Sequence, residues 1–507
     1  MRSDTSLVTV PQGEQQRRVK RKEINRQQLL LRPVEVEKLI DLDHPVRAIW
    51  ELVGRLNLEP FYVEIESVEG VAGRPVWDPQ LLISLWIYAY KDGVNSAREI
   101  ARLCEYHPAY QWLSGLEVVN YHTLADFRIR HQEALNQLFI EVLGVLSHEG
   151  LITLQRVMHD GTKVKAYASD KSFHRKATLQ DHLRLAREQV EQMGDPESEE
   201  LSQRVAKARQ RALREKQQRL EEALKELEQI EASRSKGSEK KKARASSTDP
   251  EARIMLQAKG AYGPAYNVQI STDAQSKIIV GVGVTQAPTD AAELEPAVER
   301  IQANMGDGPE QMVVDAGFTN QASMEAMNEK QVDLIGALPQ RSAMPGDRLK
   351  QRGVSSEFYP QAFEYDQRAD CYRCPAGKVL RYETQERQAA TLRRRYRAKA
   401  SDCRGCRFQP QCCPGTRRGR SLVRSEATPE IVAFQAKMET PEAQAIYKQR
   451  AGVAEFPNAW IKDKIGLRQF RLRGLAKVTL ESLWACLTYN IWQWIRLCWK
   501  PQRLVQA

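Results

Sequence analysis

Residues 151–169, LITLQRVMHDGTKVKAYAS, mark the point where the sequence changes from helical to strand patterning. Apolar residues alternate on either side of an Asp-Gly pair, which predicts two short strands around a turn. Strand patterns return in AYNVQISTDAQSKIIVGVGVTQ (265–286) and in EQMVVDAGF (310–318), and helical patterns follow near 290 and 320. Strands that lead into helices predict an α/β or α+β core built on a central sheet.

The composition indicates a soluble globular protein with a polyanionic partner. The chain has 507 residues, of which 42% are hydrophobic, and a formal net charge of +11. This basic excess favours nucleic acid over a membrane surface, and the hydrophobic content excludes a wholly disordered chain. The N-terminus has no apolar signal segment, and the apolar stretch 480–499 is broken by Glu481 and Arg496. We therefore expect a buried C-terminal helix and a cytoplasmic location.

The first 150 residues show helical periodicity. Val46, Ile49 and Val53 recur at helical spacing, and Asp78 and Gly93 are placed to begin and end a second helix. Four or five short helices in a basic protein fit either a DNA-reading helix-turn-helix or a plain helical bundle. The pattern alone does not separate these two interpretations.

Two segments interrupt the predicted core. The first begins with a charged, leucine-containing helical pattern, in which Gly194–Pro196 would form the turn of an antiparallel hairpin or coiled coil. The run SRSKGSEKKKARASSTDP (233–250) then predicts a mobile basic linker. The second segment holds most of the cysteines. We divide the chain into a basic leader (1–28), a helical N-terminal domain (29–150), a core in three parts (151–177, 250–360 and 426–507), the hairpin and linker (178–249) and the Cys-rich insertion (361–425).

Two aspartates stand where catalytic carboxylates would be useful. Asp160 is followed by Lys163 and Lys165 at alternate positions, so one strand face could hold a metal ion and meet phosphate. A plain hairpin turn is the alternative. Asp315 ends a short apolar run, where open α/β sheets place ligand-binding groups; here the alternative is a cap of the next helix.

A third acidic residue, Glu455, lies in the basic tract YKQRAGVAEFPNAWIKDKIGLRQFRLRG (447–474). Because proline fits best in a first turn, Pro457 predicts a helix that begins near Val453 and leaves Tyr447 and Arg450 on a preceding segment. A charged surface helix is the alternative for Glu455. Cations mixed with aromatic residues suit a phosphate backbone. The cations of this tract are Lys462, Lys464, Arg468, Arg471, Arg473 and Lys477.

Cysteines concentrate in one segment, where six of the nine fall between residues 371 and 413. Two Cys-x-x-Cys pairs separated by 28 residues predict a zinc ribbon, in which four thiolates hold one structural ion. Six thiols compete for four places, and an insertion with free reduced thiols is the alternative. The six are Cys371, Cys374, Cys403, Cys406, Cys412 and Cys413.

These motifs, in this order, resemble those of bacterial insertion-sequence transposases of the DDE type. HDGTKVKAYAS (159–169) and VVDAGF (313–318) look like the segments that carry the family's first two acidic residues, and stretches within 43–131 resemble the N-terminal helical domain of one subgroup. The C-terminal tract is similar to the family's Tyr-Arg-Glu-Lys signature, with Tyr447, Arg450, Glu455 and Lys462. The resemblance covers most of the chain; a departure is Phe318, where relatives often carry tyrosine.

The resemblance implies an RNase H-like catalytic core in which Asp160, Asp315 and Glu455 converge and bind Mg²⁺ (or Mn²⁺). Two such ions can activate a nucleophile and stabilise the leaving oxygen of a phosphodiester. It implies double-stranded DNA as the partner, both the element's terminal inverted repeats and the target, and a homodimer in the DNA complex. The N-terminal helical domain would then bind DNA.

Further assignments follow from the same resemblance. DNA contacts are expected from Tyr447, Arg450, Lys462, Lys163, Lys165, Arg468 and Arg471. The zinc ligands are expected to be Cys374, Cys403, Cys406 and Cys412, with Cys371 as the alternative ligand. Two other functions stay open: a catalytically inactive DNA-binding derivative, which the intact acids argue against, and a metal-dependent nuclease without strand transfer.

Overall fold

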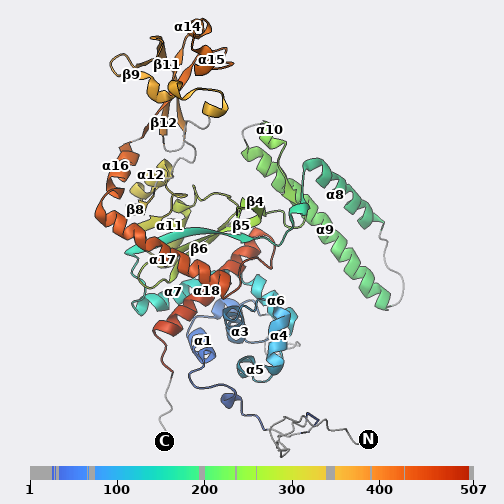
Figure 1. Ribbon diagram of the computed structural model, residues 1–507. Helices are drawn as coiled ribbons and strands as arrows, with labels where there is room; N and C mark the ends of the chain where they lie inside the picture. Colours follow the sequence, from blue (N-terminus) through green and yellow to red (C-terminus); the bar gives the residue numbers. More distant parts are fainter. Residues whose placement is uncertain are drawn as a thin grey trace, which may run out of the picture.

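The protein has a mixed α+β fold with a helical N-terminal region, a central sheet and a second sheet in the Cys-rich segment (Figure 1). The computed structural model describes residues 26–27, 29, 33–65, 67, 75–192, 200–234, 237–257, 260–337, 349–388, 391–427 and 429–501. Residues 1–25 of the expected basic leader and the expected turn at Gly194–Pro196 lie outside these ranges.

The N-terminal region is a bundle of short helices packed around α3, which is buried along most of its length. Asp78 caps α3 as predicted, because its side chain accepts a hydrogen bond of 2.7 Å from the backbone N–H of Gln80. The helices are α1 (Pro45–Val53), α2 (Glu59–Tyr62), α3 (Pro79–Lys91), α4 (Ala97–Tyr106), α5 (Pro108–Ser114), α6 (Tyr121–Arg130) and α7 (Gln132–His148), preceded by the 3-10 helix η1 (Val36–Leu39).

The central sheet follows the order β4-β5-β1-β7-β8, and β6 pairs with β5 on the same side as β4. β1 pairs antiparallel with β5 and parallel with β7, and β7 pairs parallel with β8. The strands are β1 (Arg156–Lys165), β4 (Arg253–Leu256), β5 (Tyr262–Asp273), β6 (Ile279–Thr285), β7 (Gln311–Val314) and β8 (Asp333–Gly336).

The hairpin predicted at Asp160 is wrong, because β1 runs without a break through the Asp-Gly pair. Every residue of β1 from Val157 to Lys165 has a partner on β5. Continuous ladder hydrogen bonds outweigh the local turn preference of Asp-Gly, since propensity in strands gives way to context. Asp160 therefore points from the middle of a paired strand and not from a turn.

Helices cover both faces of the central sheet. α11 (Leu294–Met305) and α12 (Gln321–Glu329) follow β6 and β7 on one side. α16 (Pro429–Met438) leads into α17 (Pro441–Asp463), which lies on the other side and packs Val453 and Ala454 on Met158 and Val313. The predicted break before Glu455 is wrong: α17 is continuous, with the buried Pro457 inside it. Packing against the sheet compensates for the backbone hydrogen bond that a proline cannot make.

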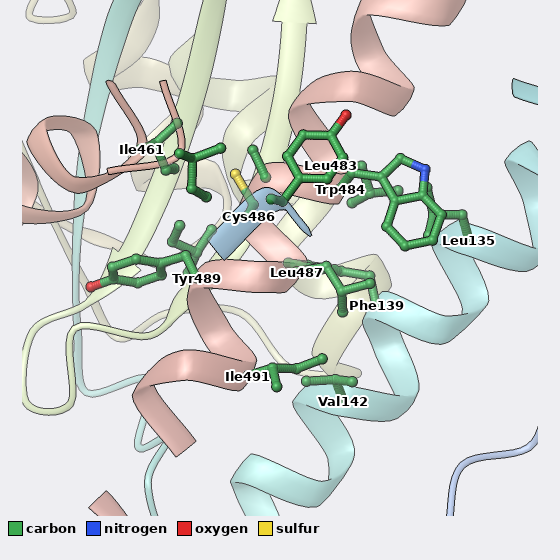
Figure 2. Close-up of a cluster of buried hydrophobic side chains, with 14 of the residues drawn as sticks. Leu135, Phe139, Val142, Ile461, Leu483, Trp484, Cys486, Leu487, Tyr489 and Ile491 are labelled. Atoms are coloured by element: carbon green, nitrogen blue, oxygen red, sulfur yellow. The ribbon is translucent and has the colours of Figure 1, made fainter. Parts of the chain in front are cut away.

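The C-terminal helix α18 (Leu475–Leu497) joins the helical region to the sheet. Figure 2 shows Leu487 and Ile491 of α18 facing Phe139 and Val142 of α7. On the sheet side, the Asn490 amide accepts from the backbone N–H of Ile279 at 2.9 Å and donates to its carbonyl at 2.8 Å. α18 is thus a buried helix as predicted, and no helix in the described ranges is long and apolar enough to cross a bilayer.

A helical arm projects beside the sheet (Figure 1). α8 (Lys176–Glu191) and α9 (Glu200–Ser233) pack through Leu179, Leu183, Leu220 and Leu227. The mobile linker predicted after α9 is wrong in its described residues. The short helix α10 (Gly237–Lys240) is followed by β3 (Ala245–Ser246), which pairs with β2 (Phe173–His174) after the 3-10 helix η2 (Asp170–Ser172). The Ser246 hydroxyl is buried against that of Ser172, so pairing at the base of the arm fixes this basic run.

The Cys-rich unit, residues 356–427, stands at the end of the molecule away from the N-terminal helices (Figure 1). Its sheet has the order β13-β12-β11-β10-β9 and a small core around Leu380, Tyr396 and Leu422. The elements are η3 (Ser356–Phe358), η4 (Pro360–Ala362), β9 (Glu364–Asp366), β10 (Cys371–Arg373), β11 (Val379–Gln388), β12 (Thr391–Ala398), α14 (Ala400–Arg404), α15 (Gln409–Cys412) and β13 (Ser421–Ala427).

The Asn490 amide makes a testable contribution to stability. Asn490→Ala should lower the free energy of unfolding by about 2–5 kcal/mol, because it leaves a buried N–H and a buried C=O of Ile279 without a partner. Urea unfolding followed by tryptophan fluorescence measures this change. Lys477→Ala, at an exposed position of the same helix, is the matched control and should shift the free energy by less than about 0.5 kcal/mol. Equal effects of the two substitutions would contradict the assignment.

Candidate active site

Asp160 and Asp315 come together at neighbouring strands of the central sheet. The parallel register pairs Met158 of β1 with Val313 of β7, and both side chains pack against α17. Because side chains alternate along a strand, Asp160 follows Met158 on that same face, and Asp315 follows the end of β7 beside it. The structure therefore brings two of the three predicted acids together under α17.

The carboxylate of Asp160 is mostly buried and is held by α17. The Asn458 amide donates to its Oδ2 at 3.0 Å, and the Arg450 guanidinium lies 3.6 Å from its Oδ1. Burial raises the pKa of Asp160 to about 6; Arg450 opposes this shift, and the nearby charges of Asp315 and Asp290 add to it. A buried carboxylate beside other carboxylates is stabilised in its charged form when a cation binds to it.

Asp315 lies in the short turn that follows β7. Its Oδ1 accepts a hydrogen bond of 2.7 Å from the backbone N–H of Gly317. The alternative interpretation of Asp315 as a helix cap is wrong, because the cap of α12 is Asn320, whose side chain accepts from the N–H of Ser323 at 3.1 Å. The charge of Asp315 is close enough to Asp160 to help raise the pKa of that carboxyl.

Glu455, the third predicted acid, lies on the flank of α17. Its neighbour Ala454 is buried on the sheet, whereas Glu455 itself is exposed. Asn458, three residues on and therefore one turn away, is the residue that contacts Asp160. Glu455 thus lies on the exposed side of the helix that covers the two aspartates, and the contacts from this helix to Asp160 come from Asn458 and Arg450.

A fourth carboxylate, Asp290, lies beside this site and was missed in the sequence. Its oxygens are 3.0 Å from the Lys163 ammonium, and it accepts hydrogen bonds from Asn267 at 2.6 Å and Gln269 at 2.8 Å. A side chain at Gly161 would place its Cβ only 2.4 Å from Asp290 Oδ1. Hydrogen bonds and the Lys163 charge lower the pKa of Asp290 despite its burial.

The hydrogen-bond network behind Asp290 is also buried. His159 contacts Ser271 and Gln269 at 2.9 Å each, and its ring packs edge-on against Phe318. Burial lowers the pKa of His159 to about 3, so the imidazole is neutral, and its hydrogen bonds link β1 to β5. Asp290 sits in the loop between β6 and α11, where a lone Asp in a polar stretch gave no signal in the sequence.

The predicted DNA-contacting residues divide by position. Lys462 donates to the Thr162 hydroxyl, Tyr447 packs in the cluster under α17, and Arg468 pairs with Asp463. The loop after α17 lies along the end of β1, because the backbone N–H of Lys165 donates to the Arg468 carbonyl at 3.2 Å. Lys165 and Arg471 are exposed. Lys163 faces Asp290 on the opposite side of β1 from Asp160.

Five cysteines line one small cavity in the Cys-rich unit, of about 30 Å³. Backbone N–H groups approach two of the sulfurs at 3.3 Å: Lys378 to Cys374 and Arg420 to Cys403. Cys371, the alternative ligand, is buried in β10 and does not line the cavity. The lining cysteines are Cys374, Cys403, Cys406, Cys412 and Cys413.

Neither group of candidate ligands is arranged as a finished metal site. Within the described ranges, no three His, Cys, Asp or Glu side chains are close enough together to hold an ion. The thiols of the Cys-rich unit are unpaired by disulfides. Asp160, Asp315 and the cavity cysteines are thus candidate ligands by position and chemistry.

Two family descriptions match the chain. A family described as "Transposase DDE domain" matches residues 373–495, from the Cys-rich unit through α17 and most of α18. A second, described as "Transposase domain", matches residues 34–130 in the N-terminal helices. No curated protein matches. Among solved structures, the cryo-EM structure of a piggyBac transposase synaptic complex with hairpin DNA matches at 10% identity, with a TM-score of 0.25, over 90% of this chain and 82% of that chain.

The raised pKa of Asp160 predicts how the protein's stability depends on pH. A carboxyl whose pKa is higher in the folded state stabilises the fold at low pH and loses that contribution as pH rises through about 6. In a metal chelator at pH 8, Asp160→Asn should therefore raise the free energy of unfolding by roughly 1–3 kcal/mol. The difference should shrink at about pH 5, where Asp160 itself takes up a proton.

Urea unfolding of the two proteins at both pH values measures this difference. Glu442→Gln, an exposed carboxyl on the same helix α17, is the control and should leave stability unchanged at either pH. Equal stability of wild type and Asp160→Asn at pH 8 would mean that Asp160 carries no such cost.

Proposed function

We propose that this chain, which matches a transposase DDE domain and a second transposase domain, is a DNA transposase that binds the ends of an insertion sequence, cleaves phosphodiester bonds there and transfers the 3′-hydroxyl ends into target DNA. The proposed catalytic residues are Asp160, Asp315 and Glu455. The observation that carries the proposal is that Asp160 lies on β1 and Asp315 directly follows β7, the parallel neighbour of β1, with the helix of Glu455 packed on Met158 and Val313 of these strands.

The strand order supports an RNase H-like core for this chemistry. An antiparallel set β6-β5-β1 is extended on the other side of β1 by the parallel strands β7 and β8, with helices between them. The helical arm and the Cys-rich unit are then insertions, the first between β1 and β4 and the second between β8 and α16.

The acids fit a divalent cation by their chemistry. Asp160 is a buried carboxylate with a raised pKa beside a second carboxylate, and cations bind between such groups. Asp160 and Asp315 would hold Mg²⁺ or Mn²⁺, and Glu455 would join them from the flank of α17. Such ions, when bound, supply charge stabilisation and an activated oxygen nucleophile.

The remaining residues of the site position DNA and the acids. Asn458 fixes the orientation of Asp160 through its 3.0 Å hydrogen bond. Arg450, at 3.6 Å from Asp160, can turn from the carboxylate to a phosphate oxygen, which a guanidinium binds with two parallel hydrogen bonds. Lys462 and Tyr447 flank it on α17, and Lys165, Arg468 and Arg471 extend the basic side of the site toward the duplex.

DNA ends would be read by the N-terminal helices, and two chains would hold two ends. A homodimer in the DNA complex follows from the need to bring both terminal inverted repeats together. Two other functions make different products. A DNA-binding derivative without activity would bind and not cut, and a metal-dependent nuclease would cut and not join.

The proposal predicts the outcome of a cleavage and joining assay with Mg²⁺ on DNA from the flanks of this protein's own gene. Asp160→Asn, Asp315→Asn and Glu455→Gln should each reduce cleavage and joining by at least about 10³-fold, because each removes a charge that holds the metal ions. Binding to the same DNA should persist. Glu442→Gln on α17 is the matched control for Glu455→Gln and should react like wild type.

Each outcome of this assay decides between the functions. Joined products from wild type, and from none of the three acid variants, support the transposase and its assigned acids. Cleaved but unjoined DNA from wild type supports the nuclease, and bound but uncut DNA supports the inactive derivative. Full cleavage by any one acid variant removes that residue from the catalytic set.

We also propose that the Cys-rich unit holds a structural zinc ion through Cys374, Cys403, Cys406 and Cys412. These four line the same cavity, and the N–H groups that approach Cys374 and Cys403 would stabilise thiolates. Burial and neighbouring thiols raise the pKa of Cys412, so this thiol needs a cation to ionise at neutral pH. An all-thiolate site is closed and serves structure and not chemistry.

Metal analysis of protein purified without chelators under reducing conditions should find about one zinc per chain. Cys403→Ser should abolish it, whereas Cys371→Ala should leave it in place, because Cys371 lies outside the cavity. Loss of zinc with Cys371→Ala would instead identify the alternative ligand. Cys498→Ser, in the C-terminal region, is the control for the loss of a thiol elsewhere. Absence of zinc from wild type would refute the site.

A further inference from the structure

The positive charge of this protein is concentrated in the Cys-rich unit. The unit (residues 356–427) contains 16 Lys and Arg and eight Asp and Glu, a net charge of +8 out of +11 for the whole chain of 507 residues, and its segment 371–424 alone holds 15 of these cations and three of these acids. The rest of the molecule is therefore close to neutral. A charge difference on this scale between two parts of one chain marks where a polyanion will bind.

The two faces of the sheet in this unit differ, because one packs on the small core, with Arg424 over the Tyr365 ring, and the other carries further arginines. Tyr396, Ala398 and Leu422 are buried on the core face. By alternation along β12, Arg393, Arg395 and Arg397 lie on the other face. The registers place Arg381 opposite Arg397, Glu386 opposite Arg393 and the exposed Val423 opposite Arg395, and Arg397 also pairs with Glu383 at 2.8 Å. Arginines outnumber the acidic residues along this face, so it suits an anionic ligand.

The segment between α14 and β13 extends the basic surface. Arg404, Arg407, Arg417 and Arg418 are exposed along this segment. Arg420 lies behind them and is buried, where it donates to the carbonyls of Cys412 at 3.0 Å and Phe358 at 2.8 Å. Arg420 is therefore held by the protein itself, whereas the four outer arginines are exposed, with Arg407 lying over the Phe408 ring at 4.6 Å.

The cations nearest to Asp160 and Asp290 are engaged within the protein, whereas Lys165 and Arg471 at the side of the site are exposed. Lys163 pairs with Asp290, Arg450 with Asp160, and Lys462 donates to Thr162. They can meet the reacting phosphate, but they provide few charges for a long stretch of DNA backbone. A second basic surface would add to the few exposed cations at the site and strengthen the binding of a duplex.

We propose that the Cys-rich unit binds the phosphate backbone of double-stranded DNA through the outer face of β12 and the arginines between α14 and β13. This inference rests on the proposed function, since a transposase has duplex DNA as its substrate. The contacts are to phosphates, so they supply affinity without sequence preference. The unit connects through α16 to α17, the helix that carries Glu455, so DNA held here is tied to the catalytic helix.

The test measures the salt dependence of DNA binding by the full chain. Fluorescence anisotropy would follow binding to a labelled duplex from the gene's flank, and to an unrelated duplex, between about 50 and 200 mM salt. Each phosphate contact adds about 0.9 to the slope of log Kobs against log salt. Arg417→Ser with Arg418→Ser should lower that slope by about 2 and cut affinity at 50 mM salt by roughly tenfold on both duplexes.

Two further variants make the result specific. Arg393→Thr with Arg395→Thr tests the sheet face with residues that suit a strand, and should have the same effect. Arg211→Gln with Arg214→Gln removes equal charge from exposed positions of the helical arm, and should leave the slope unchanged. If the strand variant does not fold, the variant at 417 and 418 still decides the matter, because both positions are exposed.

Each outcome bears on the proposal. Wild-type slopes from both variants of the Cys-rich unit would overturn it, as would an equal loss of slope in the helical-arm variant. Unchanged DNA binding together with lost binding to a polyglutamate probe would assign the surface to an acidic protein instead. Failure of the catalytic proposal is separate: wild type would then show the steep, variant-sensitive slope and yet cut no DNA.

Discussion

The pairing of β1 on both of its edges is the constraint on which the rest of the site depends. β5 holds it antiparallel over its whole length, and β7 holds its first residues parallel. A strand fixed on both sides cannot slip, because a shift of one residue would turn every side chain to the opposite face. Asp160 is thereby held toward α17 and beside Asp315, although burial of its carboxylate is unfavourable.

The helix α17 supplies the side chains that contact Asp160 on this sheet. Its apolar residues pack on Met158 and Val313, and this packing sets which of its polar residues reach Asp160. Asn458 and Arg450 do so, while Glu455 stays at the exposed edge. The helix continues through Pro457, so Arg450 and Asn458 belong to one helix. α16 joins this helix to the Cys-rich unit along the chain.

The sequence predicted the mixed α+β fold, the helical N-terminal region and the transposase family, because these follow from periodicity and from several motifs in one order. It failed where tertiary contacts override local preference. Asp-Gly favours a turn, but β5 pairs with β1 through Asp160. Pro457 favours the start of a helix, but α17 packs on the sheet and continues both before and after the proline. The run after α9 is polar and basic, yet Ser246 is buried by pairing at the base of the arm. Local pattern contains no information about such partners.

Asp290 could not be predicted for a different reason. Its position depends on an absence: Gly161 has no side chain, and the carboxylate occupies the space that a Cβ would fill. In the Asp-Gly pair of β1, Asp160 places its carboxylate on one face of the strand, and Gly161 leaves space on the other face. Asp290 fills that space and pairs with Lys163. Two carboxylates on opposite faces of one strand raise the cost of ionising Asp160. A cation that binds Asp160 therefore removes a repulsion that the fold has built in, and the glycine is as much a part of the site as the acid that precedes it.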